Sequence, residues 1–240
     1  MLGGFTLADG ETHVELPKTL QRLVAFIGLR HRTTRADTVG GLWPEVREDK
    51  ALGSLRTALW RLQQCGPRIV VAQGETLALD TRVQVDVDAL VHAARLVLTD
   101  DNSASDAALL AHGCGELLPG WLDEWVLVER ERLRQCALHG LENLAAHHLR
   151  TGRYADALDA ALRALRADPL RETPHRLLIQ VHIAEGNHSE VLSAYHAYRT
   201  LLHRELGVAP SPALQMLVRE AVRPVAPAGP GRHMRPQLRL

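Results

Sequence analysis

The chain has 240 residues, of which 46% are hydrophobic, and this is enough for one large or two ordinary domains with a buried core. Its 28 basic and 28 acidic side chains give a formal net charge of zero, which excludes a strongly basic protein, although seven cations outnumber four carboxylates between Arg30 and Arg61. The three cysteines are widely spaced, which excludes a disulfide framework and a zinc ribbon. The lack of any long apolar run excludes a membrane span. Together these observations predict a reduced, cytoplasmic protein.

The first part of the chain predicts a strand pair followed by helices. Two short runs on either side of an Asp-Gly turn are typical of a β-hairpin, with Met1 already in the first strand. A helix is expected to start at Pro17 and to follow apolar spacing to about Arg30. A second short helix, with N-cap candidates just before it, is expected over residues 36–43 and is closed by Pro44.

The third expected helix covers residues 50–64 and starts near Glu48. Four leucines fall on one stripe and are expected to be buried: Leu52, Leu55, Leu59 and Leu62. The opposite side carries donors, acceptors, two cations and an indole: Lys50, Gly53, Ser54, Thr57, Trp60, Arg61 and Gln64. These residue types read base edges in a major groove and bind phosphates, although a solvated amphipathic helix has a similar composition.

A second hairpin is expected at residues 68–79, with Gly74 in its turn. The order of strand pair, three helices and strand pair is the plan of a winged helix-turn-helix domain of the OmpR type. In this fold the third helix enters the major groove, and the hairpin is the wing that reaches the backbone or the minor groove. A winged helix can also be a purely protein-binding domain.

Helical spacing dominates the rest of the chain. A helix begins at Asp86, a polar break follows at residues 100–105, and further helices are expected at residues 106–117, 123–149, 153–167, 171–185, 187–204 and 211–222. From Arg223 onward the composition predicts a disordered tail. We therefore predict a mainly α protein with a small β component, divided into a winged-helix domain, a helical domain and a tail at residues 1–82, 86–222 and 223–240.

The helical part contains a repeat of 34 residues, which is the tetratricopeptide period. At this shift Gly152 matches Gly186, and Ala157 matches Val191. Small residues let the two helices of a repeat pack closely, and stacks of such helices bind other proteins or dimerise. The pattern predicts an all-α, tetratricopeptide-like domain.

Taken in order, these stretches resemble the Streptomyces antibiotic regulatory protein family in its short form. The resemblance covers about residues 1–222. It rests on the following motifs: Leu42-Trp43-Pro44, Ser54-Leu-Arg-Thr-Ala-Leu-Trp-Arg-Leu62, Val85-Asp-Val-Asp88, Gly115-Glu-Leu-Leu-Pro-Gly-Trp-Leu-Asp-Glu-Trp125, Glu129-Arg-Glu-Arg-Leu133, Gly152-Arg-Tyr-Ala-Asp-Ala-Leu158, Asp168-Pro-Leu-Arg-Glu172 and Glu205-Leu-Gly-Val-Ala-Pro-Ser-Pro-Ala213. It implies an OmpR-type DNA-binding domain followed by a bacterial transcriptional activation domain of tetratricopeptide-like helices.

Proteins like this bind direct repeats at promoters, usually of secondary-metabolite clusters, as side-by-side dimers. They recruit RNA polymerase by touching both DNA and polymerase subunits, including sigma factor. The resemblance therefore implies a sequence-specific activator of antibiotic biosynthesis, located in the cytoplasm at the nucleoid. Its expected partners are double-stranded promoter DNA, RNA polymerase holoenzyme and a second copy of the chain on DNA, with no cofactor and no membrane.

Eight residues are expected to contact DNA. Thr57 and Arg61 face away from the leucine stripe one turn apart, and are the candidates for base contacts. Four others are better placed for phosphate: Arg35, Lys50, Ser54 and Arg56. Arg47 is expected to bind DNA as well, and Trp60 is expected to lie against the sugar–phosphate backbone. Packing of Trp60 on the wing is an equal alternative.

Other conspicuous side chains are assigned to structure. Trp43 is expected in the core, and Trp121 and Trp125 are expected to hold the first helices of the second domain together. The adjacent His147 and His148 point to different faces of a helix, and no His-Glu-x-x-His motif occurs. With no nucleophile elbow and no Gly-x-Gly-x-x-Gly either, we predict neither a metal site nor an enzyme.

Two alternatives to an activator stay open. The zero net charge and the neutral pair Gln63-Gln64 favour a protein-interaction scaffold whose winged helix has lost DNA binding. The cations clustered on the second and third helices favour DNA. A repressor would use the same DNA-binding mode as an activator.

Overall fold

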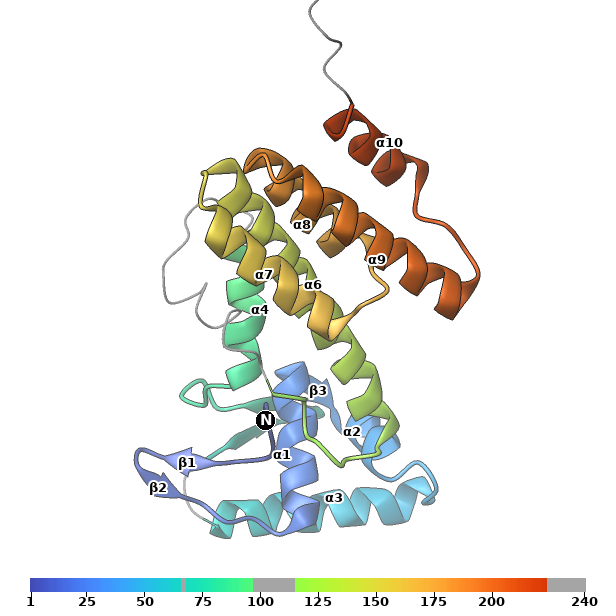
Figure 1. Ribbon diagram of the computed structural model, residues 1–240. Coiled ribbons are helices and arrows are strands. Elements are labelled where there is room, and N and C mark those ends of the chain that lie inside the picture. The colour runs from blue at the N-terminus through green and yellow to red at the C-terminus, as the bar shows by residue number, and fades with distance from the viewer. Residues whose placement is uncertain (66–67, 97–114, 224–240) are drawn as a thin grey trace, which may run out of the picture.

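The computed structural model describes residues 1–65, 68–96 and 115–223. Figure 1 shows the N-terminal strands and helices grouped at one end and a stack of long helices at the other. The chain is mainly helical with small sheets, as predicted. The helix expected at residues 106–117 lies outside the described residues except for its last three, which are not helical. Of the expected tail, residues 224–240 also lie outside them.

Three helices form the N-terminal half where the sequence predicts them. They are α1 (Lys18–Arg30), α2 (Arg35–Leu42) and α3 (Glu48–Gln64). Thr34 is the N-cap of α2, because its hydroxyl accepts a hydrogen bond of 3.0 Å from the backbone N–H of Asp37. The helices start and end close to the expected positions because local signals, such as Pro17 before α1 and this cap, fix them.

The strands form two small sheets. The first is the hairpin of β1 (Ala8–Asp9) and β2 (Thr12–His13). In the second sheet the order is β3-β5-β4, with β3 (Arg32–Thr34), β4 (Val70–Gln73) and β5 (Thr76–Leu79) all antiparallel to their neighbours. The wing hairpin is confirmed. Strand β3 is missed by the sequence analysis, which treats these residues as cap candidates only, because it is too short to show alternation and pairs with residues far along the chain.

The start of the chain differs from the expected strand. Met1 is not in a hairpin strand; instead Leu2 makes an isolated antiparallel bridge to Leu117. The terminal amine of Met1 pairs with the Asp86 carboxylate at 2.5 Å. The prediction that Met1 stands in the first strand was therefore wrong, because partners more than eighty residues away hold this segment.

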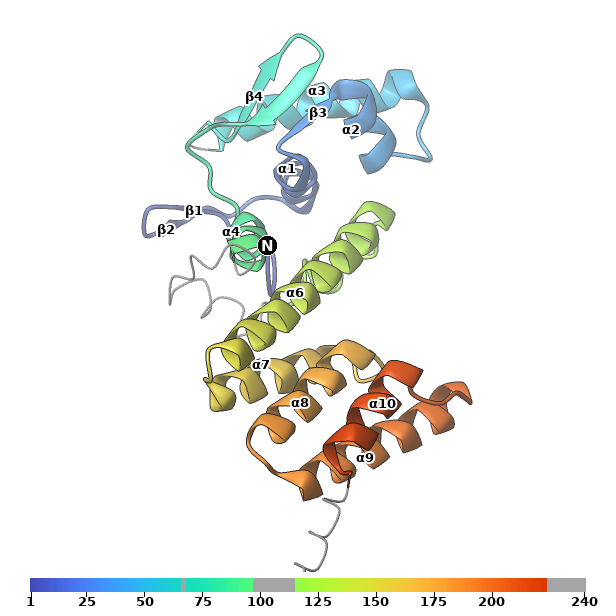
Figure 2. The same cartoon turned by 90° about the horizontal axis from the view of Figure 1, so that it is seen from above.

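The second half consists of helices in sequence order, close to the predicted ranges: α4 (Asp86–Leu96), α6 (Glu124–Arg150), α7 (Tyr154–Ala167), α8 (Glu172–Ala184), α9 (His188–Leu206) and α10 (Pro212–Ala221). Figure 2 shows the long helix α6 running from the N-terminal half to the stack formed by α7 to α10. Helix α6 packs along α7, and α8 packs along α9, so each helix lies against its neighbour in sequence.

The 34-residue repeat is visible in the backbone. Gly152 and Gly186 both adopt the left-handed conformation, with φ of +73° and +75°. The residues that follow them, Arg153 and Asn187, have φ/ψ of −86°/67° and −85°/67°. The turns that lead into α7 and α9 are therefore the same structure repeated 34 residues later, which explains why glycine occupies both positions.

Two tryptophans, Trp121 and Trp125, contact each other and also join the two halves of the molecule. The rings of Trp125 and Phe26 meet edge to face with centroids 5.2 Å apart, and Trp121 stacks on Phe5 at 6.3 Å. Both tryptophans are buried. The prediction that they pin the start of the second domain is therefore incomplete: the two rings do meet edge to face with centroids 6.3 Å apart, but each also packs on an aromatic residue about a hundred positions earlier in the chain.

Polar contacts reinforce this junction. Arg22 of α1 donates from Nε to Asp123 Oδ1 at 3.0 Å, and its other contact to that carboxylate is shorter still. The same guanidinium donates to the carbonyl of Leu42 at the end of α2. One hydrophobic cluster also runs without interruption from α1 through α4 into α7. This hydrophobic cluster thus spans the domain boundary that the sequence analysis expects near residues 82–86. The boundary itself stays a prediction.

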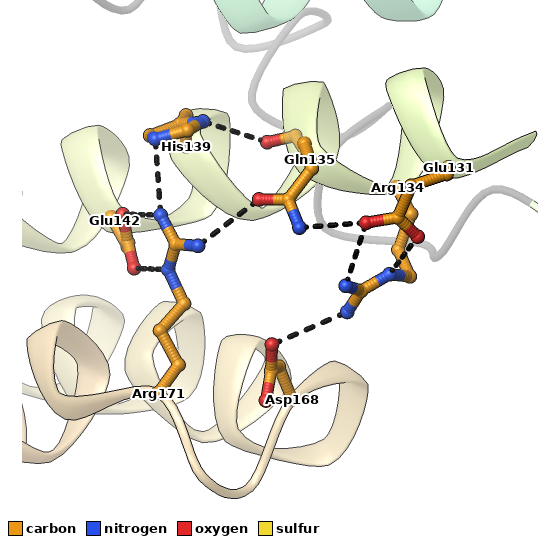
Figure 3. A network of polar contacts seen from close by, with 7 residues as sticks. All are labelled: Glu131, Arg134, Gln135, His139, Glu142, Asp168 and Arg171. Carbon is orange, nitrogen blue, oxygen red and sulfur yellow. Dashed lines mark hydrogen bonds and ion pairs between the residues drawn. The ribbon is translucent and has the colours of Figure 1, made fainter. Parts of the chain in front are cut away.

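A polar network holds α6 against the loop before α8 (Figure 3). Arg171 donates from Nε to Glu142 Oε1 at 2.5 Å and from Nη2 to Oε2 at 3.2 Å. It also donates to Gln135 and to the Nε2 atom of His139. Glu142 is buried, and among the described residues Arg171 is the cation that pairs with it, so this pair compensates for placing the carboxylate inside the protein.

We expect Arg171→Ala to lower the free energy of unfolding by roughly 2–3 kcal/mol, because it leaves Glu142 buried without its cation. The loss stays below the full value for a buried pair because the Arg171 side chain is itself partly exposed. Urea unfolding followed by circular dichroism measures this change. Arg171→Ala/Glu142→Leu should recover most of the stability, and a single variant as stable as the wild type would contradict the assignment.

Candidate nucleic-acid interface

Helix α3 divides into a buried and an exposed face. The buried face consists of Ala51, Leu55, Ala58 and Leu62, whose side chains are all at most 4% exposed. Leu52 and Leu59 are only partly buried. The predicted four-leucine stripe is therefore half right, because the small alanines allow α3 to approach the core closely and move two leucines to its edges.

The exposed face carries the predicted DNA-binding residues of this helix. The following side chains are exposed: Lys50, Ser54, Arg56, Thr57, Trp60 and Arg61. Trp60 is 62% exposed, so it does not pack on the wing. Trp43 is partly buried and packs against the core. The structure thus gathers these candidates on one accessible surface.

A shallow groove of about 580 Å³ runs beside this face, between α3 and the start of α1. Lys50, Ser54, Thr57 and Arg61 line its α3 side. Trp43 also lines it. Four of the eight candidates therefore border a common concave surface, which extends over about three turns of helix.

The cations of α3 differ in their partners. Within the described part of the chain, Lys50, Arg56 and Arg61 make no ion pair. Arg47, the residue before the helix, lies 3.5 Å from Asp49, and both side chains are mostly exposed. Glu48 and Asp49 occupy the first turn, where their negative charge interacts favourably with the positive end of the helix dipole. The middle and the end of α3 consequently carry Arg56 and Arg61 and no carboxylate.

The two hydroxyls on this face are already hydrogen-bonded inside the helix. Thr57 Oγ1 donates to the carbonyl of Gly53 at 3.0 Å, and Ser54 Oγ donates to the carbonyl of Lys50 at 3.2 Å. In this arrangement each hydroxyl has its proton engaged and its lone pairs free. Thr57 is thus prepared to accept a hydrogen bond, and its methyl group remains available for an apolar contact.

Arg35 lies apart from α3, at the wing. Its Nε donates to the carbonyl of Gly74 at 3.0 Å, and its backbone N–H donates to the carbonyl of Glu75 at 2.9 Å. Gly74 has φ of +57°, which suits the tight turn between β4 and β5. Arg35 therefore positions the wing tip against the start of α2. Sequence reasoning missed this bond, since its partners are 39 residues apart.

The remaining chemistry is sparse. Among the described residues, no group of three or more histidine, cysteine, aspartate or glutamate side chains is arranged to hold a metal ion. None of the helices in the described ranges has both the length and the apolar character that crossing a bilayer demands.

Comparison with a family model places residues 85–222 in the bacterial transcriptional activator domain. The regulatory protein AfsR of Streptomyces coelicolor is 30% identical over 223 residues, which are 87% of this chain but 22% of that protein. AfsR of Streptomyces griseus is 28% identical over 219 residues, or 86% of this chain and 22% of that protein. The chain thus spans about a fifth of the length of these curated relatives.

Among solved structures, the fold resembles that of Mycobacterium tuberculosis EmbR in complex with a low-affinity phosphopeptide. The TM-score is 0.68 at 19% identity, over 94% of this chain and 65% of that chain. This likeness establishes the shared architecture of a winged helix-turn-helix followed by a helical domain.

Proposed function

The chain belongs to the family of the bacterial transcriptional activator domain, as a transcription regulator of the Streptomyces antibiotic regulatory protein type, and from this premise we propose that it is a sequence-specific DNA-binding activator. In this proposal residues 1–82 read promoter DNA at direct repeats. Residues 86–222 hold a second copy of the chain on DNA and contact RNA polymerase holoenzyme, including sigma factor. The protein then acts at the nucleoid.

The observation that carries the proposal is the exposed face of α3. Three cations without an ion pair in the described residues, Lys50, Arg56 and Arg61, lie on the helix that a winged helix-turn-helix inserts into the major groove. The carboxylates Glu48 and Asp49 are confined to its first turn. This distribution favours base reading by the middle and end of α3.

Within this face we assign the roles by reach and chemistry. Arg61 carries a fork of N–H donors that matches the O6 and N7 acceptors of guanine. Thr57, one turn earlier, can accept from the amino group of adenine or cytosine, or touch a thymine methyl group. Arg47, Lys50, Ser54, Arg56 and Trp60 are assigned to the sugar–phosphate backbone.

The wing contributes less charge to this proposal. The hairpin residues 70–79 include no cation, and Glu75 lies at the turn. Phosphate contacts on the wing side therefore fall to Arg35, whose remaining guanidinium N–H groups stay available beside Gly74. The wing is expected to help orient the domain more than to add affinity.

The experiment that tests the proposal is a binding selection on genomic fragments with the purified protein at two salt concentrations. A spaced direct repeat near promoters, with affinity that falls steeply as salt rises, is the expected result. In vitro transcription from a recovered promoter then separates an activator from a repressor, because both would select the same operator. Recovery of no fragment above background at low salt would instead favour a protein-interaction scaffold.

Lys50→Gln provides a test of the phosphate contacts. We expect it to weaken binding to specific and nonspecific DNA alike and to reduce the slope of log affinity against log salt by about one, because one phosphate contact is lost. Filter binding or fluorescence anisotropy over a salt series measures the slope. Arg199→Gln, which removes one exposed charge from α9, is the matched control and should leave the slope unchanged.

A further inference from the structure

A second concave site lies away from α3, between the start of the chain and the linker that enters the helical half. It has a volume of about 500 Å³. Three parts of the chain wall it: residues 1–9, the base of the wing and residues 82–86. Figures 1 and 2 both place the β1–β2 hairpin next to this linker. The volume falls in the range of roughly 300–1,000 Å³ that holds small molecules in proteins.

The floor of this cleft is apolar and is formed by residues of the hydrophobic core. Val24 of α1, Ile69 before β4 and Val85 before α4 are buried, and all three line the cleft. Phe5 and Leu7 add partly buried apolar surface from the N-terminal segment. An occupant with an apolar body would remove the exposed part of Phe5 and Leu7 from water, while Val24, Ile69 and Val85, which are already largely covered, would supply packing contacts.

The charged groups around the cleft are unequally satisfied. The carboxylate of Asp86 is bound by the Met1 amine at 2.5 Å and the Leu2 N–H at 2.7 Å. Arg82 donates to both oxygens of Asp80, at 2.9 and 3.2 Å. Arg68, in contrast, lines the cleft, is exposed, and makes no hydrogen bond or ion pair within the described ranges.

The carboxylates of Asp80 and Asp9 both act on Arg82, the lining cation that is already paired. Asp80 first, and Asp9 to a smaller extent, raise the pKa of Arg82. Arg82 in turn lowers the pKa of Asp80 to about 2, and the charge of Arg68 contributes to this shift to a smaller extent. Arg68 acts on Asp80 through its charge alone, so its guanidinium N–H groups, which donate to no described residue, are left for an anion.

We propose that this cleft binds a small amphipathic anion, a carboxylate with an acyl or aromatic body. The apolar body lies on Val24, Ile69 and Val85, and the carboxylate pairs with Arg68. This site is independent of the proposed DNA contacts, since none of its lining residues in the described chain belongs to α3. Because its walls come from both the wing base and the linker, a ligand there would fill a space between the winged helix and the segment that leads into α4.

The test is calorimetric titration of the full chain with octanoate and with octanamide, its neutral counterpart. We expect saturable 1:1 binding of octanoate and about tenfold weaker binding of octanamide, since the amide lacks the charge-assisted pair. Arg68→Gln should weaken octanoate about tenfold and leave octanamide unchanged. Arg219→Gln, an exposed arginine on α10, is the matched control and should bind like the wild type.

A second variant fills the cleft. Val83 lines it and is only partly buried, so Val83→Trp should block both ligands while far-UV circular dichroism shows a folded protein. Three results would overturn the proposal: no saturable binding of octanoate to the wild type, unchanged octanoate affinity in Arg68→Gln, or unchanged affinity in folded Val83→Trp. If Val83→Trp does not fold, the octanoate affinity of Arg68→Gln and the comparison of octanoate with octanamide still test the proposal.

Discussion

Thr57→Ala/Arg61→Ala is expected to lower affinity for the selected operator at least hundredfold while nonspecific DNA binding falls only severalfold. Each good base contact contributes about 1–3 kcal/mol of discrimination, and the two side chains lie one turn apart on the same exposed face. The loss should be largest at two neighbouring positions of each half-site. Electrophoretic mobility shift with operator and scrambled duplexes measures both affinities.

Single variants separate the two contacts. Arg61→Lys keeps the charge but loses the fork, so it should retain nonspecific affinity and lose preference for guanine. Thr57→Val keeps the shape and the apolar contact and removes the hydroxyl, so it distinguishes acceptance of a hydrogen bond from contact with a thymine methyl group. Arg199→Ala is the charge-matched control. Full specific binding by the double variant would contradict the assignment of α3 as the reading helix.

Trp125→Ala is expected to lower the free energy of unfolding by about 3–5 kcal/mol, which is roughly 10 °C in Tm for a chain of this size. The indole is buried at the junction, edge to face with Phe26 and with Trp121. Its Nε1–H has no hydrogen-bond acceptor among the described residues, so the expected loss comes from packing and from the contact of the ring with the Arg30 guanidinium, 6.0 Å from the ring centroid. Thermal unfolding followed by far-UV circular dichroism measures it.

The conservative variant sharpens this prediction. Trp125→Phe keeps an aromatic edge against Phe26 and gives up no hydrogen bond, so it should cost much less than alanine, about 1–2 kcal/mol. The wild type should unfold in one transition, because one core cluster runs through both halves. Two well-separated transitions in the wild type, or an alanine variant as stable as the wild type, would show that the junction contributes little.

Much of the architecture is readable from local sequence. The leucine spacing of α3, the proline before α1 and the glycines at 152 and 186 each act within one or two turns of chain, so the helices and the repeat could be placed without partners. The exposed side of α3 follows from the same periodicity. The candidates Thr57 and Arg61 could be chosen for this reason, although their contacts with DNA stay predictions.

Other features have no local signal. Strand β3 exists because Arg32–Thr34 pairs with β5, and Arg35 is tied to Gly74 because that pairing brings the wing tip to α2. The burial of Ala51 and Ala58 in place of two leucines depends on how closely α3 approaches the core. Each of these is set by which surfaces meet, and many registers satisfy the same local pattern.

The sequence by itself determined the helix positions, the 34-residue repeat, the wing turn and the family resemblance, because short-range periodicity, caps and turns fix them. Only the tertiary structure decided that Trp121 and Trp125 join the halves, that Arg171 compensates Glu142, and that the start of the chain and the linker enclose a cleft. These contacts join residues 29 to about 115 positions apart. Their energy depends on distance in space, which the order of residues does not specify.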